Sequence, residues 1–241
     1  MPRFFSQEMS EKSGKIRGAD AMHIAKVLRM NPGEEITVCD LAGTDYTCRI
    51  LSADCDEIDL EVIASSPSKT EPSVDVTLYM ALPKGDKMEL IVQKCVELGV
   101  NRIVPMLTAR CVSRPDEKSM QKKTERYRKI AYEASKQCGR GKIPTVDFCM
   151  DFGQAVNEAA AQSDLAVLFY ECSQTPLKPF FDVHPQKIAV FVGSEGGFEP
   201  QEAALAEKHN ITTASLGPRI LRCETAAIVA TTAVMLYTEN L

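Results

Sequence analysis

A glycine-rich stretch with one acidic residue follows the apolar run 188–192. It reads GSEGG, with Glu195 inside it, and Pro200 can open the helix expected next. A strand that ends in such a loop before a helix usually has a ligand at its carboxyl end. The spacing fits neither the phosphate-binding loop motif, which needs a lysine, nor the dinucleotide fingerprint. The stretch therefore indicates either a backbone that approaches a ligand closely, or a turn whose acid only caps a helix.

A second glycine turn follows the next short apolar run. Gly217 turns the chain after Leu216, and Arg219 and Arg222 precede a helix of small and apolar residues that begins near Glu224. Because the loop is otherwise poor in charge, the two arginines favour a role at a ligand over simple surface solvation. Two such turns at the ends of late strands predict one shared pocket.

The chain beyond residue 73 alternates short apolar runs with helical patterns. This succession predicts an α/β fold with a mostly parallel sheet and helices on its faces. The expected strands cover residues 74–82, 102–106, 145–148, 165–170, 187–192 and 213–216. The expected helices cover residues 86–98, 119–138, 152–161, 200–209 and 224–238.

The amino-terminal part alternates apolar and polar residues in short runs, which predicts a small antiparallel sheet or barrel. One helix interrupts it, with Asp20 as a plausible N-cap and Asn31, Pro32 and Gly33 as its stop. Residues 65–73 combine Ser, Pro, Lys and Glu without periodicity and are predicted to be a linker. The sequence therefore predicts two domains, residues 1–70 and residues 74–241.

The composition is that of an ordinary soluble globular protein, with 44% apolar and 25% charged residues among 241. No run approaches the ~18 apolar residues of a membrane span, and the first residues do not read as a signal peptide, so a cytoplasmic protein is expected. The nine cysteines are odd in number and never in C-x-x-C pairs, and there are three histidines. Reduced thiols and no metal site are expected.

The charge is unevenly distributed. The whole chain carries a net −5, but residues 84–142 hold 15 Lys and Arg against 7 Asp and Glu, a net +8, between two acidic flanks. A clustered positive field attracts phosphate even on an anionic protein. The alternative is a solvated helix face, because the charges of EKSMQKKTERYRKIAYEASKQ recur at helical spacing.

Two strings make the chain recognisable. FVGSEGGFEPQE and LGPRILRCETA resemble the knotted SPOUT methyltransferases, specifically the bacterial family that methylates N3 of a uridine in small-subunit (16S) ribosomal RNA. Further similar strings, in order along nearly the whole chain, are RFF, HIAKVLRMNPGEEI, KGDKMELIVQKCVELGV, EASKQCGR and LAVLFYE. The family usually has proline where this chain has Ser194.

The resemblance implies a small RNA-recognising PUA-like β-barrel joined to an α/β domain whose carboxyl-terminal third forms a deep trefoil knot. General folding rules treat knots as essentially absent, so only the resemblance predicts one. It also implies a homodimer formed through the knotted domain, and S-adenosylmethionine held mainly by backbone groups of three loops. The residues implied at that cofactor are Leu168, Tyr170, Glu171, Val192, Gly193, Glu195, Gly196, Gly197, Leu216, Gly217, Ile220, Leu221 and Arg222.

The reaction implied is an in-line methyl transfer to uracil N3, which becomes nucleophilic only as its proton leaves. Arg219 and Arg222 are candidates for stabilising the developing anion, and Glu195 and Glu224 are candidate bases, although either acid could simply cap a helix. Candidate RNA contacts are Arg3, His23, Arg29, Lys84, Lys94, Arg110, Arg114, Lys136, Arg140 and Lys142. For His23, a place in the protein core is an equal alternative.

Two other functions remain open from the sequence. One is a knotted methyltransferase acting on ribose 2′-oxygen, against which the predicted barrel and the string LGPRILRCETA argue. The other is a noncatalytic RNA-binding or ribosome-assembly factor that has lost the cofactor. The intact glycines of both turns argue against such a loss.

Overall fold

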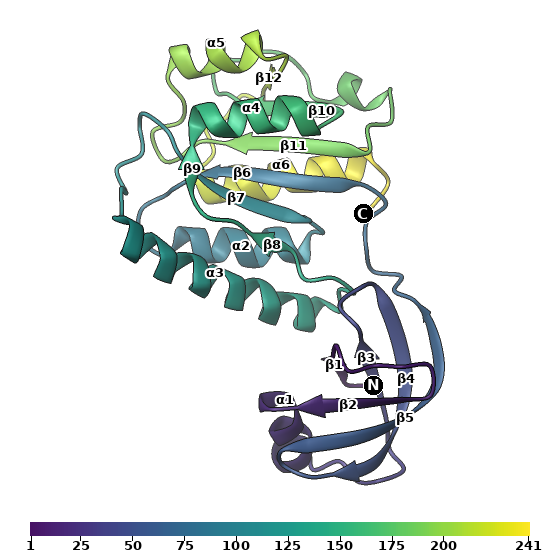
Figure 1. Cartoon of the computed structure of the whole chain (residues 1–241). Coiled ribbons are helices and arrows are strands. Elements are labelled where there is room, and N and C mark those ends of the chain that lie inside the picture. Colours follow the sequence, from purple (N-terminus) through teal and green to yellow (C-terminus); the bar gives the residue numbers. More distant parts are fainter. The chain divides into compact units, whose positions relative to one another are not determined.

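The computed structural model describes residues 1–241 and divides into two compact units (Figure 1). The first unit comprises Met1–Glu71 and Ser135–Ile143, and the second comprises Pro72–Ala134 and Pro144–Leu241. The sequence pattern does not anticipate that residues 135–143 group with the amino-terminal part. They do so through long-range pairing, because the Arg140 guanidinium lies 2.8 Å from the Glu71 carboxylate.

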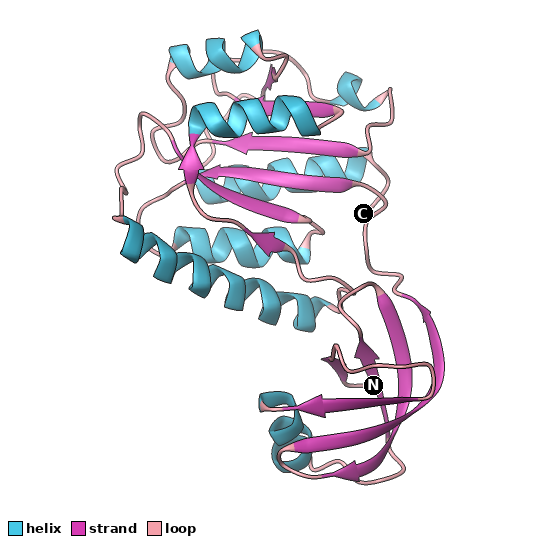
Figure 2. Ribbon diagram, in the orientation of Figure 1, coloured by secondary structure: helices cyan, strands magenta, loops and turns pink.

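The first unit is a five-stranded, strongly curved sheet in the order β1-β3-β4-β5-β2 (Figure 2). Its strands are β1 (Arg3–Phe5), β2 (Ser13–Arg17), β3 (Glu35–Cys39), β4 (Thr44–Ala53) and β5 (Glu57–Pro67). All neighbours are antiparallel except β1, which lies parallel to β3. Alternate side chains of each strand point to one face, and residues such as Ile36, Ile58 and Leu60 form a core there. The predicted small sheet is confirmed.

The predicted linker begins too early. β5 continues to Pro67, which pairs with Thr44 of β4, so the first residues of 65–73 belong to the sheet. The end of β5 is exposed and carries no apolar alternation, which is why the sequence pattern did not identify it as strand.

The helical insertion of the first unit differs from the prediction at both ends. It consists of α1 (Ala19–Met22) followed by a π-helix, η1 (His23–Leu28). Gly18, with φ 68°, precedes the first turn in place of the predicted cap Asp20, whose carboxylate instead accepts a hydrogen bond from Lys136 Nζ at 2.6 Å. Arg29 adopts a left-handed conformation and ends the helix before the predicted stop at Asn31.

The second unit contains a parallel sheet in the order β12-β10-β11-β6-β7-β8, with β9 also pairing with β7. Its strands are β6 (Asp75–Ala81), β7 (Arg102–Leu107), β8 (Thr145–Val146), β9 (Met150–Asp151), β10 (Leu165–Phe169), β11 (Lys187–Val192) and β12 (Thr212–Ala214). The central strands β6 and β11 are almost wholly buried, as expected for parallel strands covered on both faces. The predicted α/β fold with a mostly parallel sheet is confirmed.

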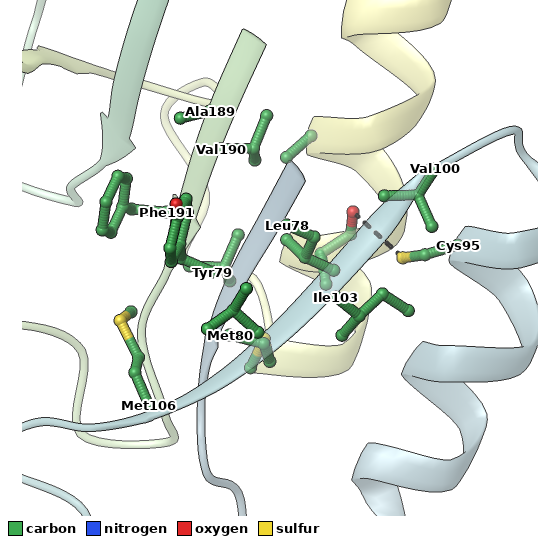
Figure 3. Packing of buried hydrophobic residues seen from close by; sticks show 14 of the residues in the cluster. Leu78, Tyr79, Met80, Cys95, Val100, Ile103, Met106, Ala189, Val190 and Phe191 are labelled. Atoms are coloured by element: carbon green, nitrogen blue, oxygen red, sulfur yellow. Dashed lines mark hydrogen bonds between the residues drawn. The ribbon is translucent and has the colours of Figure 1, made fainter. Parts of the chain in front are cut away.

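Helices cover both faces of this sheet. They are α2 (Lys87–Glu97), α3 (Glu117–Cys138), α4 (Phe152–Gln162), α5 (Pro200–Lys208) and α6 (Cys223–Tyr237), with a short 3₁₀ helix η2 (Lys178–Phe181). On one face, α6 packs against α2 and against β6 and β11, with Leu78 and Val190 turned toward it (Figure 3). On the other face, Phe191 stacks on Tyr79 at 4.5 Å between ring centroids and meets Phe152 of α4 edge-on.

Capping residues explain where two of these helices begin. Asp151 and Gln154 form a reciprocal capping box at the start of α4, and Glu199 and Glu202 form another at the start of α5. Pro200 occupies the first turn of α5, as the sequence predicted. The glycine-rich stretch is therefore held between a buried strand and a well-capped helix.

Candidate active site

Three loops meet at one edge of the second unit because neighbouring parallel strands end on the same side. They follow β10, β11 and β12, which are adjacent in the sheet. The loops after β10 and β12 are joined directly: Tyr170 N–H donates to Ala214 O at 3.0 Å, and Ser215 N–H donates to Thr175 O at 3.1 Å. The two glycine turns predicted to share a pocket thus lie at the same edge.

The loop after β11, residues 193–197 and hereafter the glycine loop, is a tight turn. Gly197 N–H donates to Ser194 O at 2.9 Å, and Gly197 has φ 67°, a conformation that L side chains rarely adopt. A Cβ on Gly197 would lie 2.8 Å from a carboxylate oxygen of Glu171, in the neighbouring loop. A Cβ on Gly193 would lie 2.9 Å from the backbone of Gly197. These two positions therefore need glycine for the turn to close.

Arg110, in the β7–α3 connection, contacts the glycine loop at two points. Arg110 donates from its guanidinium to Gly196 O at 2.9 Å, so this predicted RNA contact also holds the turn. Ser194, where the similar family usually has proline, is buried, and its hydroxyl lies 3.5 Å from Arg110 O. The serine thus fits the turn without a proline ring.

The acid of the glycine loop is tied to the start of α2. Glu195 Oε1 accepts hydrogen bonds from Lys84 N–H at 3.0 Å and from Lys87 Nζ at 2.9 Å. Burial pushes the pKa of Glu195 upward, but the hydrogen bonds from Lys87 and from backbone N–H groups outweigh it and leave the pKa below its ordinary value. Glu195 is therefore ionised at neutral pH and is a weak proton acceptor.

Glu224, in the first turn of α6, shares the same lysine. Lys87 Nζ lies 3.5 Å from Glu224 Oε2, and the hydrogen bond from the Glu224 backbone N–H, the largest influence, lowers the pKa of that carboxyl. The thiol of Cys223 donates to the same carboxylate at 3.2 Å, and burial raises the pKa of Cys223 to about 12. This thiol is therefore no nucleophile at neutral pH.

The loop after β12, residues 216–222 and hereafter the arginine loop, is open. Arg219, Ile220 and Arg222 are exposed, Ile220 to 89%, and neither guanidinium has a hydrogen-bond or ion-pair partner. Gly217 has φ 107°, and a Cβ there would meet nothing within 4 Å. The arginine loop thus offers an apolar side chain, two unpaired cations and open space next to a tight turn. These features fit a ligand with both apolar and anionic parts.

The other predicted cofactor residues lie beside these loops. Leu168 is buried in β10, with Tyr170 and Glu171 just beyond the end of that strand. Val192 is the last residue of β11, and Leu221 is half-buried before α6. All predicted cofactor positions therefore belong to the strand ends and loops of this one edge.

The predicted RNA contacts of the first unit divide into free and paired side chains. His23, Arg29 and Lys142 are exposed, so His23 does not lie in the core. Arg140 is only 2% exposed, and its ion pair with Glu71 gives it a structural place instead of a phosphate contact.

Two more cations of the first unit are engaged within it. Arg3 forms a two-pronged pair with Asp45, with N–O distances of 2.7 and 2.9 Å. Lys136 pairs with Asp20, and its ammonium lies over the Phe4 ring at 5.6 Å from the centroid. Both cations therefore already have interaction partners within the protein in the absence of RNA.

The second unit carries the remaining candidates. Lys84, Arg110 and Arg114 are exposed, whereas Lys94 pairs with Glu97 one turn along the same helix. Arg114 donates to Thr108 O at 2.8 Å, which orders the connection before α3. Sequence reasoning missed Lys87 as a site residue, although it lies inside the recognisable string KGDKMEL.

A cavity of about 520 Å³ lies in the second unit, near the ends of β6, β7 and β9. Its lining residues are Leu82, Leu107, Pro115, Glu117, Met120, Gln121, Phe148, Cys149, Met150, Asp151 and Gln154. None of them belongs to the glycine loop or the arginine loop.

Two further features bear on chemistry. No group of three or more His, Cys, Asp and Glu side chains is arranged to hold a metal ion. None of the helices has the length and apolar character needed to cross a membrane.

Comparison with known families assigns the class. Residues 70–235 match the family described as RNA methyltransferase domain, and residues 16–63 match the RNA methyltransferase PUA domain. The two matches define an RNA methyltransferase with a PUA domain at its amino-terminal side. The class agrees with the loops at the carboxyl edge of the parallel sheet.

Full-length relatives define the family more narrowly. Ribosomal RNA small subunit methyltransferase E of Bacillus subtilis is 33% identical over 100% of this chain and 98% of its own length. The chain belongs to the ribosomal RNA small subunit methyltransferase E family. The resemblance identified from the sequence strings is confirmed.

Solved structures agree. The enzyme of the same name from Neisseria gonorrhoeae, bound to S-adenosyl methionine, has 28% identity and a TM-score of 0.84, covering 98% of this chain and 97% of its own. A methyltransferase structure from Legionella pneumophila with the bound cofactor SAM has 30% identity and a TM-score of 0.85, covering 97% and 96%. Both similarities extend over both units.

Proposed function

We propose that the protein transfers a methyl group from S-adenosylmethionine to N3 of a specific uridine in 16S ribosomal RNA of the small subunit. Family membership makes it a methyltransferase of small-subunit ribosomal RNA that uses this donor. The choice of N3 rests on the resemblance of the string LGPRILRCETA. The observation that carries the proposal is the placement of a closed glycine loop and an open, unpaired arginine loop at the same sheet edge.

The residues at this edge fit the methyl donor. The backbones of residues 168–171, 193–197 and 216–222 would hold it, with the exposed Ile220 offering apolar surface to its base. When bound, the donor supplies an electrophilic methyl group on a sulfonium. The loops hold the reactants in line, and such positioning can account for ~7–11 kcal/mol of a barrier.

Arg219 and Arg222 stabilise the negative charge that develops on uracil as N3 loses its proton. Their lack of protein partners supports this role, since both guanidinium groups are available to the substrate. Glu195 and Glu224 are poorly suited as bases because both pKa values are lowered. They act as fixed anions that hold the loops.

The RNA is recognised by both units. Residues 1–70 act as a PUA-like RNA-binding domain and residues 74–241 as the methyltransferase domain. The exposed side chains of His23, Arg29, Lys84, Arg110, Arg114 and Lys142 contact phosphate. Phosphate contacts dominate the affinity and make it depend steeply on salt.

The carboxyl-terminal third forms the deep trefoil knot of the SPOUT fold, and two copies pair through this domain. Apolar side chains on α6 that remain exposed in one copy support the pairing, among them Leu236 at 57% and Val229 at 37%. A ribosomal substrate also fits a cytoplasmic location.

The test is nucleoside analysis after reaction. Small subunits or 16S RNA without the modification are incubated with the protein and S-adenosylmethionine, digested, and separated by liquid chromatography with mass spectrometry. A new 3-methyluridine is expected. A 2′-O-methylated nucleoside would assign the reaction to ribose, and no product with any substrate form would favour a noncatalytic RNA-binding factor.

A further inference from the structure

One ammonium group lies between the two acids of the candidate site. Lys87 Nζ is 2.9 Å from Glu195 Oε1 in the glycine loop and 3.5 Å from Glu224 Oε2 at the start of α6. We propose that Lys87 is a positioning residue that ties the glycine loop to the amino-terminal end of α6 and so sets the affinity for the methyl donor. This inference rests on the proposed function of these loops.

Lys87 is well placed for such a role because its own helix is fixed. It is the first residue of α2, and Met88 and Ile91 of the same helix lie in the core. The two acids it joins lie 108 and 137 positions further along the chain. Lys87 therefore links the glycine loop and the start of α6 to a helix that is anchored in the core.

The charges around the ammonium favour one arrangement. The groups that face it are the carboxylates of Glu195 and Glu224, while the Cys223 thiol and the Lys84 N–H bond to those carboxylates. The hydrogen bond that Lys87 Nζ donates to the Glu195 carboxylate raises the pKa of Lys87, so the lysine stays protonated. Without it, two ionised carboxylates would face each other without a cation, and their repulsion would separate the two segments.

Separating the two segments would weaken donor binding, although Lys87 itself does not contact the donor. A ligand that needs an ordered site binds more weakly in proportion to the fraction of protein in the competent arrangement. Donor dissociation constant and donor KM should therefore rise together, while kcat at saturating donor changes much less. A residue that contacted the reacting atoms would lower kcat instead.

The first experiment is calorimetry of S-adenosylmethionine with the purified full chain. Lys87→Met is expected to raise the dissociation constant roughly tenfold or more, as for loss of a charged hydrogen bond. Lys87→Arg keeps the charge and is expected to restore most of the affinity. Arg126→Met is the matched control. Arg126 lies in α3 and pairs with Glu89 of α2, the helix that also carries Lys87, and this pair lies outside the site.

A double-mutant cycle decides whether Lys87 acts through the acid. In a Glu195→Gln background, adding Lys87→Met should cause little further loss, since the pair is already broken. Glu195→Gln alone should also weaken donor binding, but less than Lys87→Met, because it removes the salt bridge without leaving two unpaired carboxylates; it also tests the idea if Lys87→Met does not fold. Equal losses from Lys87→Met in both backgrounds would overturn the proposal.

Two other results would also overturn it. One is unchanged donor affinity in Lys87→Met together with weaker RNA binding, which would make the lysine a phosphate contact. The other is equal loss in Arg126→Met, which would indicate a general effect of α2. Donor binding is measured here without RNA, so a wild-type chain that binds donor without producing 3-methyluridine would refute the proposed target and leave this inference standing.

Discussion

The glycine loop and the arginine loop lie at the same sheet edge but differ in how much of their structure is already satisfied. In the glycine loop, backbone, acid and serine all have partners within the protein. In the arginine loop, both guanidinium groups and Ile220 face solvent. A loop that satisfies its own polar groups is suited to hold a ligand in a fixed place, whereas an unpaired one is suited to respond to charge that appears during reaction.

The arginine loop should therefore carry the largest effect on rate. Arg222→Ala is expected to reduce methylation by ~10²–10³-fold, because removing one donor to a developing anion has costs of that order. Donor affinity should stay near that of the wild type, since only the side chain is lost. The rate is measured by nucleoside mass spectrometry and the donor affinity by calorimetry.

Arg222→Lys is the control, because it retains charge without the planar fork of donors. It should keep part of the activity lost in the alanine variant. If calorimetry instead finds that Arg222→Ala no longer binds donor, the comparison fails, and the arginine loop belongs to the binding scaffold as the glycine loop does.

The glycine loop should show the opposite pattern: a substitution there should reduce donor affinity more than it reduces the methylation rate. Gly197→Ala forces a side chain into a left-handed conformation, because Gly197 has φ 67°. The strain is about 1–3 kcal/mol, which corresponds to roughly five- to 150-fold in donor affinity. The donor affinity is measured by calorimetry.

Gly153→Ala is the matched substitution, because a Cβ there meets nothing and Gly153 lies within α4. Its donor affinity should be unchanged and its thermal stability equal or slightly higher. Wild-type donor affinity in Gly197→Ala would mean that the turn is not part of the binding scaffold.

Much of this architecture could be predicted from local pattern. The long apolar runs of β6 and β11 identify buried parallel strands, and Pro200 with its flanking acids identifies the start of α5. The two glycine turns could be assigned to one edge because carboxyl ends of parallel strands meet. These features depend on residues close in sequence.

What could not be predicted depends on pairs far apart in sequence. The Lys87–Glu195 contact spans 108 positions, and no periodicity signals it. From the sequence, Arg140 was interpreted as a surface cation, but in the structure it is paired with Glu71. The strand β9 has only two residues, which is too short for a sequence pattern to identify it. The sequence thus predicts the loops of the candidate site but not the lysine that connects them.

The same contrast between paired and unpaired charge can be tested in the first unit. Lys142→Ala removes an exposed cation without an ion-pair partner and should weaken RNA binding several-fold, lowering the salt slope by about one. Lys15→Ala removes a lysine already paired with Glu57 and Asp59, and should weaken it less. Binding of 16S RNA fragments is measured at several salt concentrations.

A flat dependence of wild-type affinity on salt would contradict the assignment of all these cations to phosphate. Equal effects of Lys142→Ala and Lys15→Ala would contradict the narrower claim that pairing within the protein removes a cation from the RNA surface.

The smallest effect concerns pH. The folded-state pKa values of Glu195 and Glu224 lie below the ordinary 4.5, so the stabilisation from their ionised forms is complete above that value. It is lost as pH falls through the lowered pKa values, when protons displace the Lys87 contacts. Donor affinity is therefore expected to be flat above about pH 6 and to decline only in acid, with a shallower decline in Glu195→Gln. A decline centred near neutral pH would instead identify a histidine or another group as the one that holds the loops.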